Sequence, residues 1–325
     1  MTFSGSNINI GIDAGSSLSK LAYSDNLSTR IIAQTEGLNL LALREGAEAF
    51  FDDMILACVI AIPETFTSIQ RENVIVQAKS SGFQEVNIIT AHEALTLALK
   101  PDENEKVLVY DFGASKSEFV ILEGEKVLDS VNIPDVCGNK FDEIFAEYLR
   151  ERKLLKENPI SEARRIKIVL SQESSRMWHN TEILRDDFER LIYFTVKRAL
   201  HIMERLQRVH KPKRIILTGG CANIPLVRKI LIDEFGITPE IDFNIIVRGA
   251  SLKAFSLSRE ALRNKETVNI SAGLKKIRNE LIALEDKLTR SQKDRLYLLL
   301  KQAEGINDAG IINLMENMLD EIREA

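Results

Sequence analysis

Three short segments place small and hydroxyl residues directly after apolar strands. They read IGIDAGSS at residues 10–17, VLVYDFGAS at residues 107–115 and IILTGGCANIP at residues 215–225. Glycine and serine in such turns let backbone amides come close to a phosphate group, and the hydroxyls can donate to its oxygens. One turn of this kind is weak evidence. Three in one chain predict a site for a nucleotide or another phosphate ligand.

The sequence around these turns predicts strands that alternate with helices, as in an α/β protein. A second series of elements of similar form begins at Gly138, so duplicated lobes would bring the three turns around one site. The expected strands are residues 8–13, 20–23, 29–34, 57–62, 86–90, 107–111, 119–123, 126–131 and 215–218. The expected helices are residues 42–54, 68–80, 91–99, 140–153, 162–170, 185–210, 225–235 and 249–258.

The last part of the chain has a different character, because strands stop after about residue 260. Residues 271–325 predict three helical segments. The first carries an apolar stripe at helical spacing that must be buried against something, which favours a small helical bundle. The stripe consists of Leu274, Ile277, Leu281, Leu284 and Leu288.

Composition narrows the class of protein. A chain of 325 residues exceeds the usual single core, and 45% hydrophobic with 28% charged residues is typical of soluble globular proteins. The net charge of −5, with both signs interspersed, argues against nucleic-acid or membrane partners. The N-terminus has no leader pattern, so a cytoplasmic location is expected. Cys58, Cys137 and Cys221 are too far apart in sequence to suggest a disulfide framework or a zinc site.

In this order, the three segments resemble the two phosphate hairpins and the adenosine loop of the actin, Hsp70 and sugar-kinase superfamily. Within it, the chain resembles the Hsp70/DnaK chaperones. Residues 59–66 followed by Gln70 and Arg71 are similar to the strand-Pro-aromatic-Gln-Arg segment of that family, and residues 163–171 to its adenosine-contacting helix. The resemblance implies a two-lobed actin-like ATPase fold of class α/β, with duplicated ribonuclease-H-like lobes, mixed sheets and a C-terminal α-helical bundle. The expected divisions are 1–131 for the first lobe, 132–260 for the second, and 261–325 for a linker and lid-like bundle.

The resemblance also implies ATP or ADP with Mg²⁺ as cofactors. It assigns Asp13 and Asp111 to the magnesium ion, through water. The residues that it assigns to the phosphates are Gly15, Ser16, Ser17, Gly113, Ala114 and Ser115, and those that it assigns to the adenosine are Lys167, Ser171, Gly219, Gly220 and Asn223.

Several segments of the family have no counterpart of adequate length. The chain between Asp13 and Val59 is too short for the first peripheral subdomain, which carries the catalytic lysine of the family. Residues 171–215 leave room for little beyond one long helix, and residues 258–272 cannot form the peptide-binding β-sandwich. The sequence therefore predicts a reduced Hsp70.

The residues for hydrolysis also depart from the family pattern. The catalytic carboxylate aligns with Ala91, the threonine of the second hairpin with Lys116, and the acidic residue two positions further on with Glu118. The arginine that stacks on the base aligns with Asn223, and an acidic residue before the last glycine with Phe243.

Lys116 and Glu93 are weak candidates for the missing catalytic groups, whereas His92 is expected to be a solvated residue at a helix start. The resulting hypothesis is a chaperone-related nucleotide-binding protein with weak ATPase chemistry and protein partners. The alternatives are a non-catalytic pseudo-ATPase scaffold and a small-molecule kinase of the same superfamily.

Overall fold

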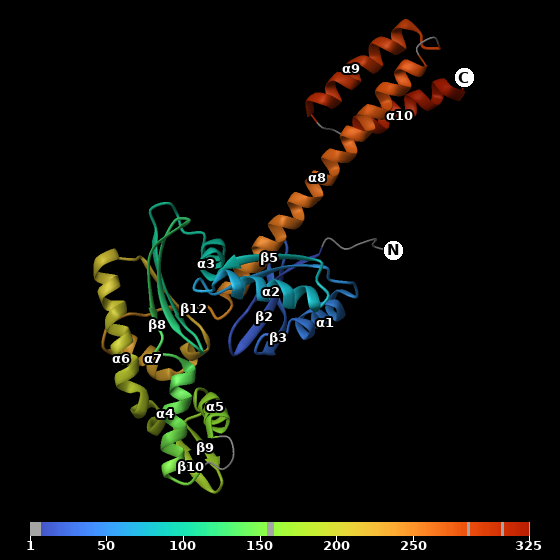
Figure 1. Ribbon diagram of the computed structural model, residues 1–325. Helices are drawn as coiled ribbons and strands as arrows, with labels where there is room; N and C mark the ends of the chain where they lie inside the picture. The colour runs from blue at the N-terminus through green and yellow to red at the C-terminus, as the bar shows by residue number, and fades with distance from the viewer. Residues whose placement is uncertain (1–7, 155–158, 285–286, 307–308, 325) are drawn as a thin grey trace. The chain divides into compact units, whose positions relative to one another are not determined.

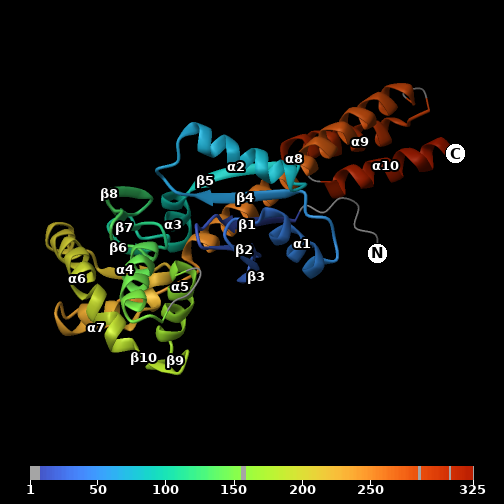
Figure 2. The ribbon, with the colours of Figure 1, turned by 60° about the horizontal axis from the view of Figure 1, so that its bottom comes forward.

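The computed structural model describes residues 8–154, 159–284, 287–306 and 309–324. It divides into two compact units, Met1–Phe255 and Ser256–Ala325. The first unit contains two five-stranded sheets with helices packed against them, and the second unit is helical (Figures 1 and 2).

The first sheet has the strand order β3-β2-β1-β4-β5. Strand β1 is antiparallel to β2 and parallel to β4, so the sheet is mixed. The continuous apolar run of β4 is buried over nearly its whole length, as expected for a central parallel strand. The strands are β1 (Asn9–Asp13), β2 (Leu18–Ser24), β3 (Thr29–Glu36), β4 (Ala57–Ile62) and β5 (Glu85–Thr90).

The second sheet repeats this arrangement, with the order β8-β7-β6-β11-β12. Strand β6 is antiparallel to β7 and parallel to β11, as β1 is to β2 and β4. The fold is therefore the expected pair of duplicated lobes with mixed sheets. The strands are β6 (Lys106–Phe112), β7 (Ser117–Glu123), β8 (Lys126–Ile133), β11 (Arg214–Thr218) and β12 (Glu240–Ile241).

Two helix layers bury these sheets. One core joins the first sheet to its helices, and another joins the second sheet to four helices and the loops between them. A smaller cluster packs Leu95 and Ile245 against Val109 and Val120 of the second sheet. The helices of the Met1–Phe255 unit are α1 (Leu40–Phe51), α2 (Ser68–Ser80), α3 (Ala91–Leu99), α4 (Gly138–Glu151), α5 (Pro159–Leu170), α6 (Arg185–His210), α7 (Pro225–Asp233) and the short 3-10 helix η1 (Gly220–Asn223).

The sequence placed residues 107–131 in the first lobe, and this assignment is wrong. Strands β6, β7 and β8 belong to the second sheet, because β6 pairs with β11 over Arg214–Thr218. The sequence also predicted little beyond one long helix in the segment after α5, but the structure has a β-hairpin there before that helix. Strands β9 (Ser175–Trp178) and β10 (Thr181–Leu184) form a hairpin there, with His179 and Asn180 both at positive φ in its turn.

Helix α8 (Ile245–Ala283) is continuous through the residues where the sequence placed a linker. Its beginning packs closely on the first lobe. A Cβ atom added to Gly11 of β1 would lie 2.1 Å from the backbone nitrogen of Ser251. Ser24 of β2 and Ser251 also share a buried hydrogen bond of 2.6 Å between their hydroxyls. Because α8 is helical throughout residues 258–272, this segment holds no β-sandwich.

The Ser256–Ala325 unit is a bundle formed by the end of α8 with α9 (Arg290–Ile306) and α10 (Ala309–Glu324). The apolar stripe predicted from the sequence lies in its core, where Ile277 and Leu281 are buried with Leu296, Met315 and Leu319. The sequence thus predicted both the bundle and the face that it buries.

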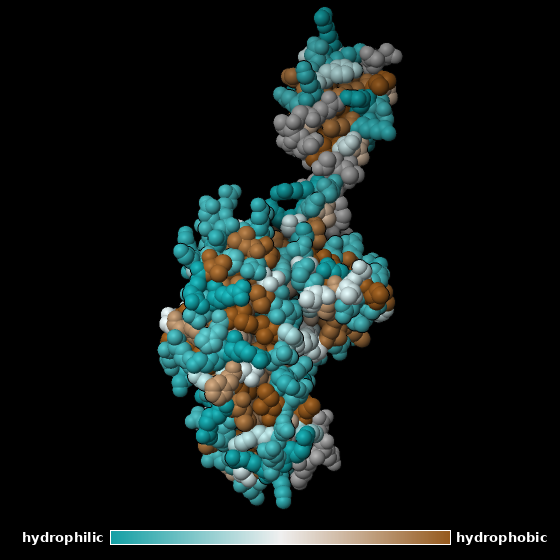
Figure 3. Space-filling model, turned by 60° about the vertical axis from the view of Figure 1, so that its left-hand side comes forward, coloured by the Kyte–Doolittle hydropathy of each residue, from teal (hydrophilic) through white to brown (hydrophobic). Residues whose placement is uncertain are grey.

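The face seen in Figure 3 is mainly hydrophilic, with separate apolar patches. Among the residues whose burial the structure describes, the most exposed large apolar side chains are Leu27 at 94% and Phe194 at 80%. Single exposed apolar residues of this kind are common on protein surfaces and carry no functional conclusion. Among the described residues, no helix combines the length and the apolar character needed to cross a membrane.

Candidate functional site

Asp13 and Asp111 occupy equivalent places in the two lobes. Asp13 ends β1, and Asp111 lies next to the end of β6, the strand that corresponds to β1 in the second sheet. Burial and the neighbouring carboxylate of Asp111 raise the pKa of Asp13 to about 7, although Lys20 opposes the shift. Burial likewise raises the pKa of Asp111 to about 6, against the effect of Lys116 and together with that of Glu118. The duplicated fold therefore brings the two carboxylates close enough for Asp111 to disfavour the charged form of Asp13.

The residue opposite each aspartate carries a charge, but the sign differs between the lobes. Lys20 pairs with Asp13 across β1 and β2, and Glu118 pairs with Asp111 across β6 and β7. The Nζ atom of Lys20 donates to the carbonyl oxygen of Phe243 at 2.6 Å and to Oδ1 of Asn244 at 2.9 Å. No local sequence pattern indicates this place for Lys20, because only the strand register shows that it lies opposite Asp13.

The two predicted phosphate turns lie next to each other. The Oγ atom of Ser16 donates to Oγ of Ser115 at 3.1 Å. The backbone also fixes the turns. The amides of Gly138 and Asn139 at the start of α4 donate to the carbonyl oxygens of Gly113 and Ala114, at 3.1 and 2.7 Å. In the first turn, Gly15 accepts from Ser19, and Ser17 accepts from the amide of Gly37.

The third glycine turn meets the second at Asp111. Gly219 has a φ of +82°, which favours glycine, and a Cβ atom there would lie 2.6 Å from Oδ1 of Asp111. Gly220 begins η1, which ends at Asn223, and the side-chain Nδ2 atom of Asn223 donates to the carbonyl oxygen of Gly220 at 3.3 Å. The predicted adenosine turn, which follows β11, therefore lies beside the Asp111 side chain near the C-terminal end of β6.

Two residues predicted to contact adenosine have partners within the protein. Lys167 is nearly buried, donates to the carbonyl oxygen of Gly138 at 2.9 Å and forms an ion pair with Asp142. Ser171 donates to the carbonyl oxygen of Lys167 within the last turn of α5. Lys167 lies close to Gly138 and Cys221, so it borders the turn region, but its ammonium group is already neutralised.

The two weak catalytic candidates differ in their surroundings. Glu93 and Thr90 form a capping box at the start of α3, in which Glu93 accepts from the amide of Thr90 at 2.6 Å. The Nζ atom of Lys116 lies 3.0 Å from Oε2 of Glu118. Its positive charge lowers the pKa of Asp111, against the larger effect of burial. Glu93 therefore has a structural role, whereas Lys116 is a cation at the edge of the aspartate pair.

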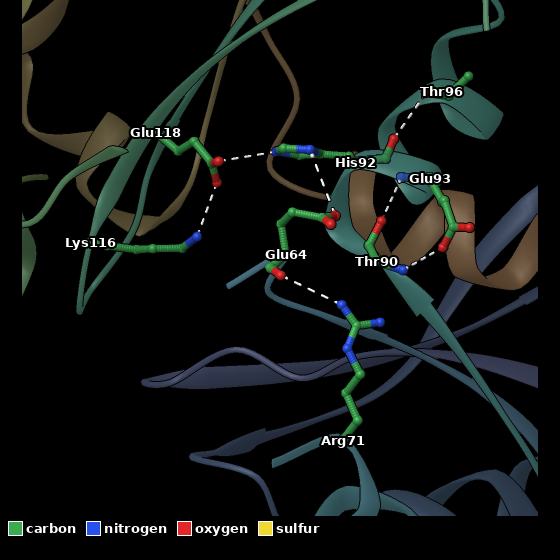
Figure 4. A network of polar contacts seen from close by, with 8 residues as sticks. All are labelled: Glu64, Arg71, Thr90, His92, Glu93, Thr96, Lys116 and Glu118. Atoms are coloured by element: carbon green, nitrogen blue, oxygen red, sulfur yellow. Dashed lines mark hydrogen bonds and ion pairs between the residues drawn. The ribbon is translucent and has the colours of Figure 1, made fainter. Parts of the chain in front are cut away.

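His92 was expected to be solvated, and this expectation is wrong. Only 8% of its surface is exposed, because Glu118 of the second lobe and Glu64 of the first lobe flank its ring (Figure 4). Its Nε2 atom lies 3.0 Å from Oε1 of Glu118, and its Nδ1 atom lies 3.7 Å from Oε2 of Glu64. His92 thus connects the two lobes at the rim of the candidate site.

Comparison with known proteins agrees with this geometry. The sequence model of the family described as "Hsp70 protein" matches residues 34–272, well over half of the chain. The chain is 25% identical over 317 residues to the chaperone protein HscA of Buchnera aphidicola subsp. Baizongia pistaciae, covering 86% of this chain and 61% of that protein. It is 27% identical over 240 residues to an HscA homolog of Haemophilus influenzae, and 29% identical over 229 residues to one of Rickettsia africae. These two matches each cover 66% of this chain, and 39% and 38% of the relatives.

The duplicated mixed sheets and the glycine turns at their strand ends define a two-lobed α/β protein of the actin-like ATPase class. With the family match, the chain belongs to the Hsp70 family and is related in sequence to chaperones. It spans between 38% and 61% of the length of these three relatives.

Proposed function

We propose that this chain binds ATP or ADP with Mg²⁺ where the two lobes meet, as members of the Hsp70 family do. The proposal rests on the equivalent places of Asp13 and Asp111 in the two sheets and on the effect of Asp111, which together with burial raises the pKa of Asp13. Two half-buried carboxylates near each other cost free energy unless a cation lies between or near them. Carboxylate oxygens and water are the ligands that Mg²⁺ prefers. The residues at the site therefore fit the ion.

The surrounding groups suit a nucleotide. We assign the phosphates to the backbone and hydroxyls of residues 15–17 and 113–115, with Lys20 and Lys116 as cations on opposite sides. The turn of Gly219 and Gly220 would accommodate the adenosine, with Asn223 at the end of η1. Since Lys167 and Ser171 have partners within the protein, their part in binding adenosine is expected to be small.

A thermal-shift experiment tests this proposal. Mg-ATP at about 100 times its Kd should stabilise the protein by about 2.7 kcal/mol, which raises the melting temperature by several degrees. The same nucleotide with EDTA should have a much smaller effect. Asp111→Ala should abolish the shift, whereas Asp102→Asn, in an exposed turn before β6, should retain it. An equal shift in both variants would contradict the proposed site.

We further propose that hydrolysis is slow. The position of the family's catalytic carboxylate is Ala91, which has no ionisable group, and the nearby Glu93 carboxylate caps α3. A missing group that orients the attacking water costs about a hundredfold in rate.

Ala91→Glu is therefore expected to increase the turnover of ATP at least tenfold. Residue 91 is the first residue of α3, where a carboxylate also interacts favourably with the helix dipole, so the variant should fold normally. Single-turnover release of phosphate measures the effect, and Ala91→Gln is the uncharged control. A rate unchanged in Ala91→Glu would show that water activation does not limit turnover.

The partners are proposed to be proteins, as for a chaperone-related member of the family, and the expected location is the cytoplasm. The three cysteines of this chain are buried free thiols, in accord with a reducing compartment. Because α8 is continuous where a peptide-binding sandwich would be inserted, we place the part of this chain in recognising a client or partner in the lobes or the helical unit.

A non-catalytic scaffold is the second candidate. It is favoured by the Lys167 and Asp142 ion pair, which neutralises a predicted adenosine ligand inside the protein. ATP turnover that Asp13→Ala abolishes would rule out this alternative.

A further inference from the structure

One carboxylate, that of Glu118, joins two basic side chains that come from different lobes (Figure 4). Its Oε1 atom lies 3.0 Å from Nε2 of His92 in α3, and its Oε2 atom lies 3.0 Å from Nζ of Lys116 at the turn before β7. Glu118 and His92 are only 7% and 8% exposed. A carboxylate this well buried needs a partner within the protein, because leaving it unpaired would cost free energy.

The ring of His92 is held from its other side as well. Its Nδ1 atom faces Oε2 of Glu64 at 3.7 Å. Arg71 holds the segment after β4 in place, since its Nε atom donates to the carbonyl oxygen of Phe66 at 3.2 Å. The imidazole therefore has a fixed place in the first lobe, from which it reaches Glu118 of the second.

Lys116 lies at the other end of this chain of contacts, beside the aspartate pair. Asp111 is directly opposite Glu118 in the register of β6 and β7, and the amide of Gly113 donates to the carbonyl oxygen of Lys116 at 3.0 Å. The ammonium group of Lys116 thus extends from the turn that is assigned to the phosphates.

We infer that His92 and Glu118 are positioning residues, which orient the ammonium group of Lys116 toward a bound phosphate only while the two lobes are in contact. This inference rests on the proposed function. When a phosphate attracts Lys116, Glu118 retains the donor that His92 supplies from the first lobe. Without His92, Glu118 holds Lys116 as its sole partner and competes with the phosphate for it. The strength of phosphate binding thereby depends on a residue that does not touch the ligand.

A double-mutant cycle tests this inference in the full chain, with Mg-ATP as the probe and the Kd measured by calorimetry. Lys116→Met should weaken binding at least tenfold, and His92→Phe about fivefold. The double variant should bind no more weakly than Lys116→Met, because His92 acts only through the lysine. His92→Gln, whose amide can still donate to Glu118, should recover most of the wild-type affinity. His210→Phe removes another histidine paired with a carboxylate, that of Asp129, and should leave the Kd unchanged.

Multiplicative losses in the double variant, about fiftyfold in all, would overturn the positioning role while leaving nucleotide binding intact. If the wild-type protein binds no Mg-ATP, the proposed function fails and the inference fails with it. If His92→Phe does not fold, Glu118→Gln takes its place in the cycle, since it removes the charge that holds Lys116 and keeps the side-chain volume. That cycle must also be non-additive, because Glu118 acts on the phosphate only through Lys116, and an effect of Glu118→Gln on the Kd that persists unchanged in Lys116→Met would again overturn the inference.

Discussion

Gly249→Ala is expected to destabilise the Met1–Phe255 unit by about 3 kcal/mol. A Cβ atom at residue 249 would lie 1.9 Å from the carbonyl oxygen of Ala94 and 2.5 Å from its carbonyl carbon. Because both atoms belong to the backbone of α3, no side-chain rotation can relieve the overlap. Helix α8 would have to move away from α3. This movement would also disturb its close packing on β1, where the backbone of Ser251 lies against Gly11.

Urea unfolding followed by the fluorescence of Trp178 measures this loss, because Trp178 is the only tryptophan and lies in the Met1–Phe255 unit. Gly273→Ala is the matched control, because it makes the same change in the same helix. Its added Cβ atom would meet only side-chain atoms of Ile312, at 3.0 and 3.4 Å, and alanine favours a helix by up to about 1 kcal/mol over glycine. If both variants unfold at the wild-type urea concentration, the close packing of α8 on the first lobe contributes little stability.

Asp13→Asn is expected to stabilise the unliganded protein by about 2 kcal/mol at pH 8. The pKa of Asp13 is raised to about 7 in the folded protein, from an ordinary value of 3.8, by burial and by Asp111. Between these two values the unfolded chain loses its proton first, so the folded state of the wild-type protein becomes less stable as the pH rises. Asparagine has the shape of the protonated acid and no charge to lose, and Lys20 offsets only part of the cost in the wild type.

Melting temperatures of the two proteins in EDTA, measured at pH 4.5 and pH 8, check both the sign and the pH range. The difference should be small at pH 4.5 and largest at pH 8. Asp102→Asn is the control for the loss of one negative charge and should show little difference at either pH. If Asp13→Asn lowers the melting temperature at pH 8, Asp13 contributes to the fold through an attraction that outweighs its repulsion from Asp111.

Local sequence patterns predicted many elements, such as β4 and the 26-residue α6, with the correct ends. Strand β4 is a continuous apolar run followed by Pro63, and α6 has apolar residues at helical spacing over its whole length. The hairpin of β9 and β10 was missed because each strand has only four residues, and its turn is His-Asn instead of the usual Asn-Gly. The continuity of α8 was missed because its middle is polar, so no apolar stripe extends across it.

Only those parts of the candidate site whose residues are neighbours in the sequence were predicted. Each glycine turn carries its signal locally, and the structure brings Ser16 to Ser115 and Gly219 to Asp111. The charged partners are different, because they depend on strand register and on contact between the lobes. His92 lies 26 residues from Glu118 in sequence, and no local pattern indicates that this pair is buried.

Isothermal titration calorimetry with ATP and ADP tests the central claim most directly, with and without Mg²⁺, on the wild-type protein and Asp13→Ala. We predict binding of the magnesium complexes with a Kd in the micromolar range, weaker binding in EDTA, and loss of at least a hundredfold in affinity in Asp13→Ala. The absence of heat at protein concentrations that detect millimolar affinity would contradict a nucleotide site between the lobes and favour the scaffold.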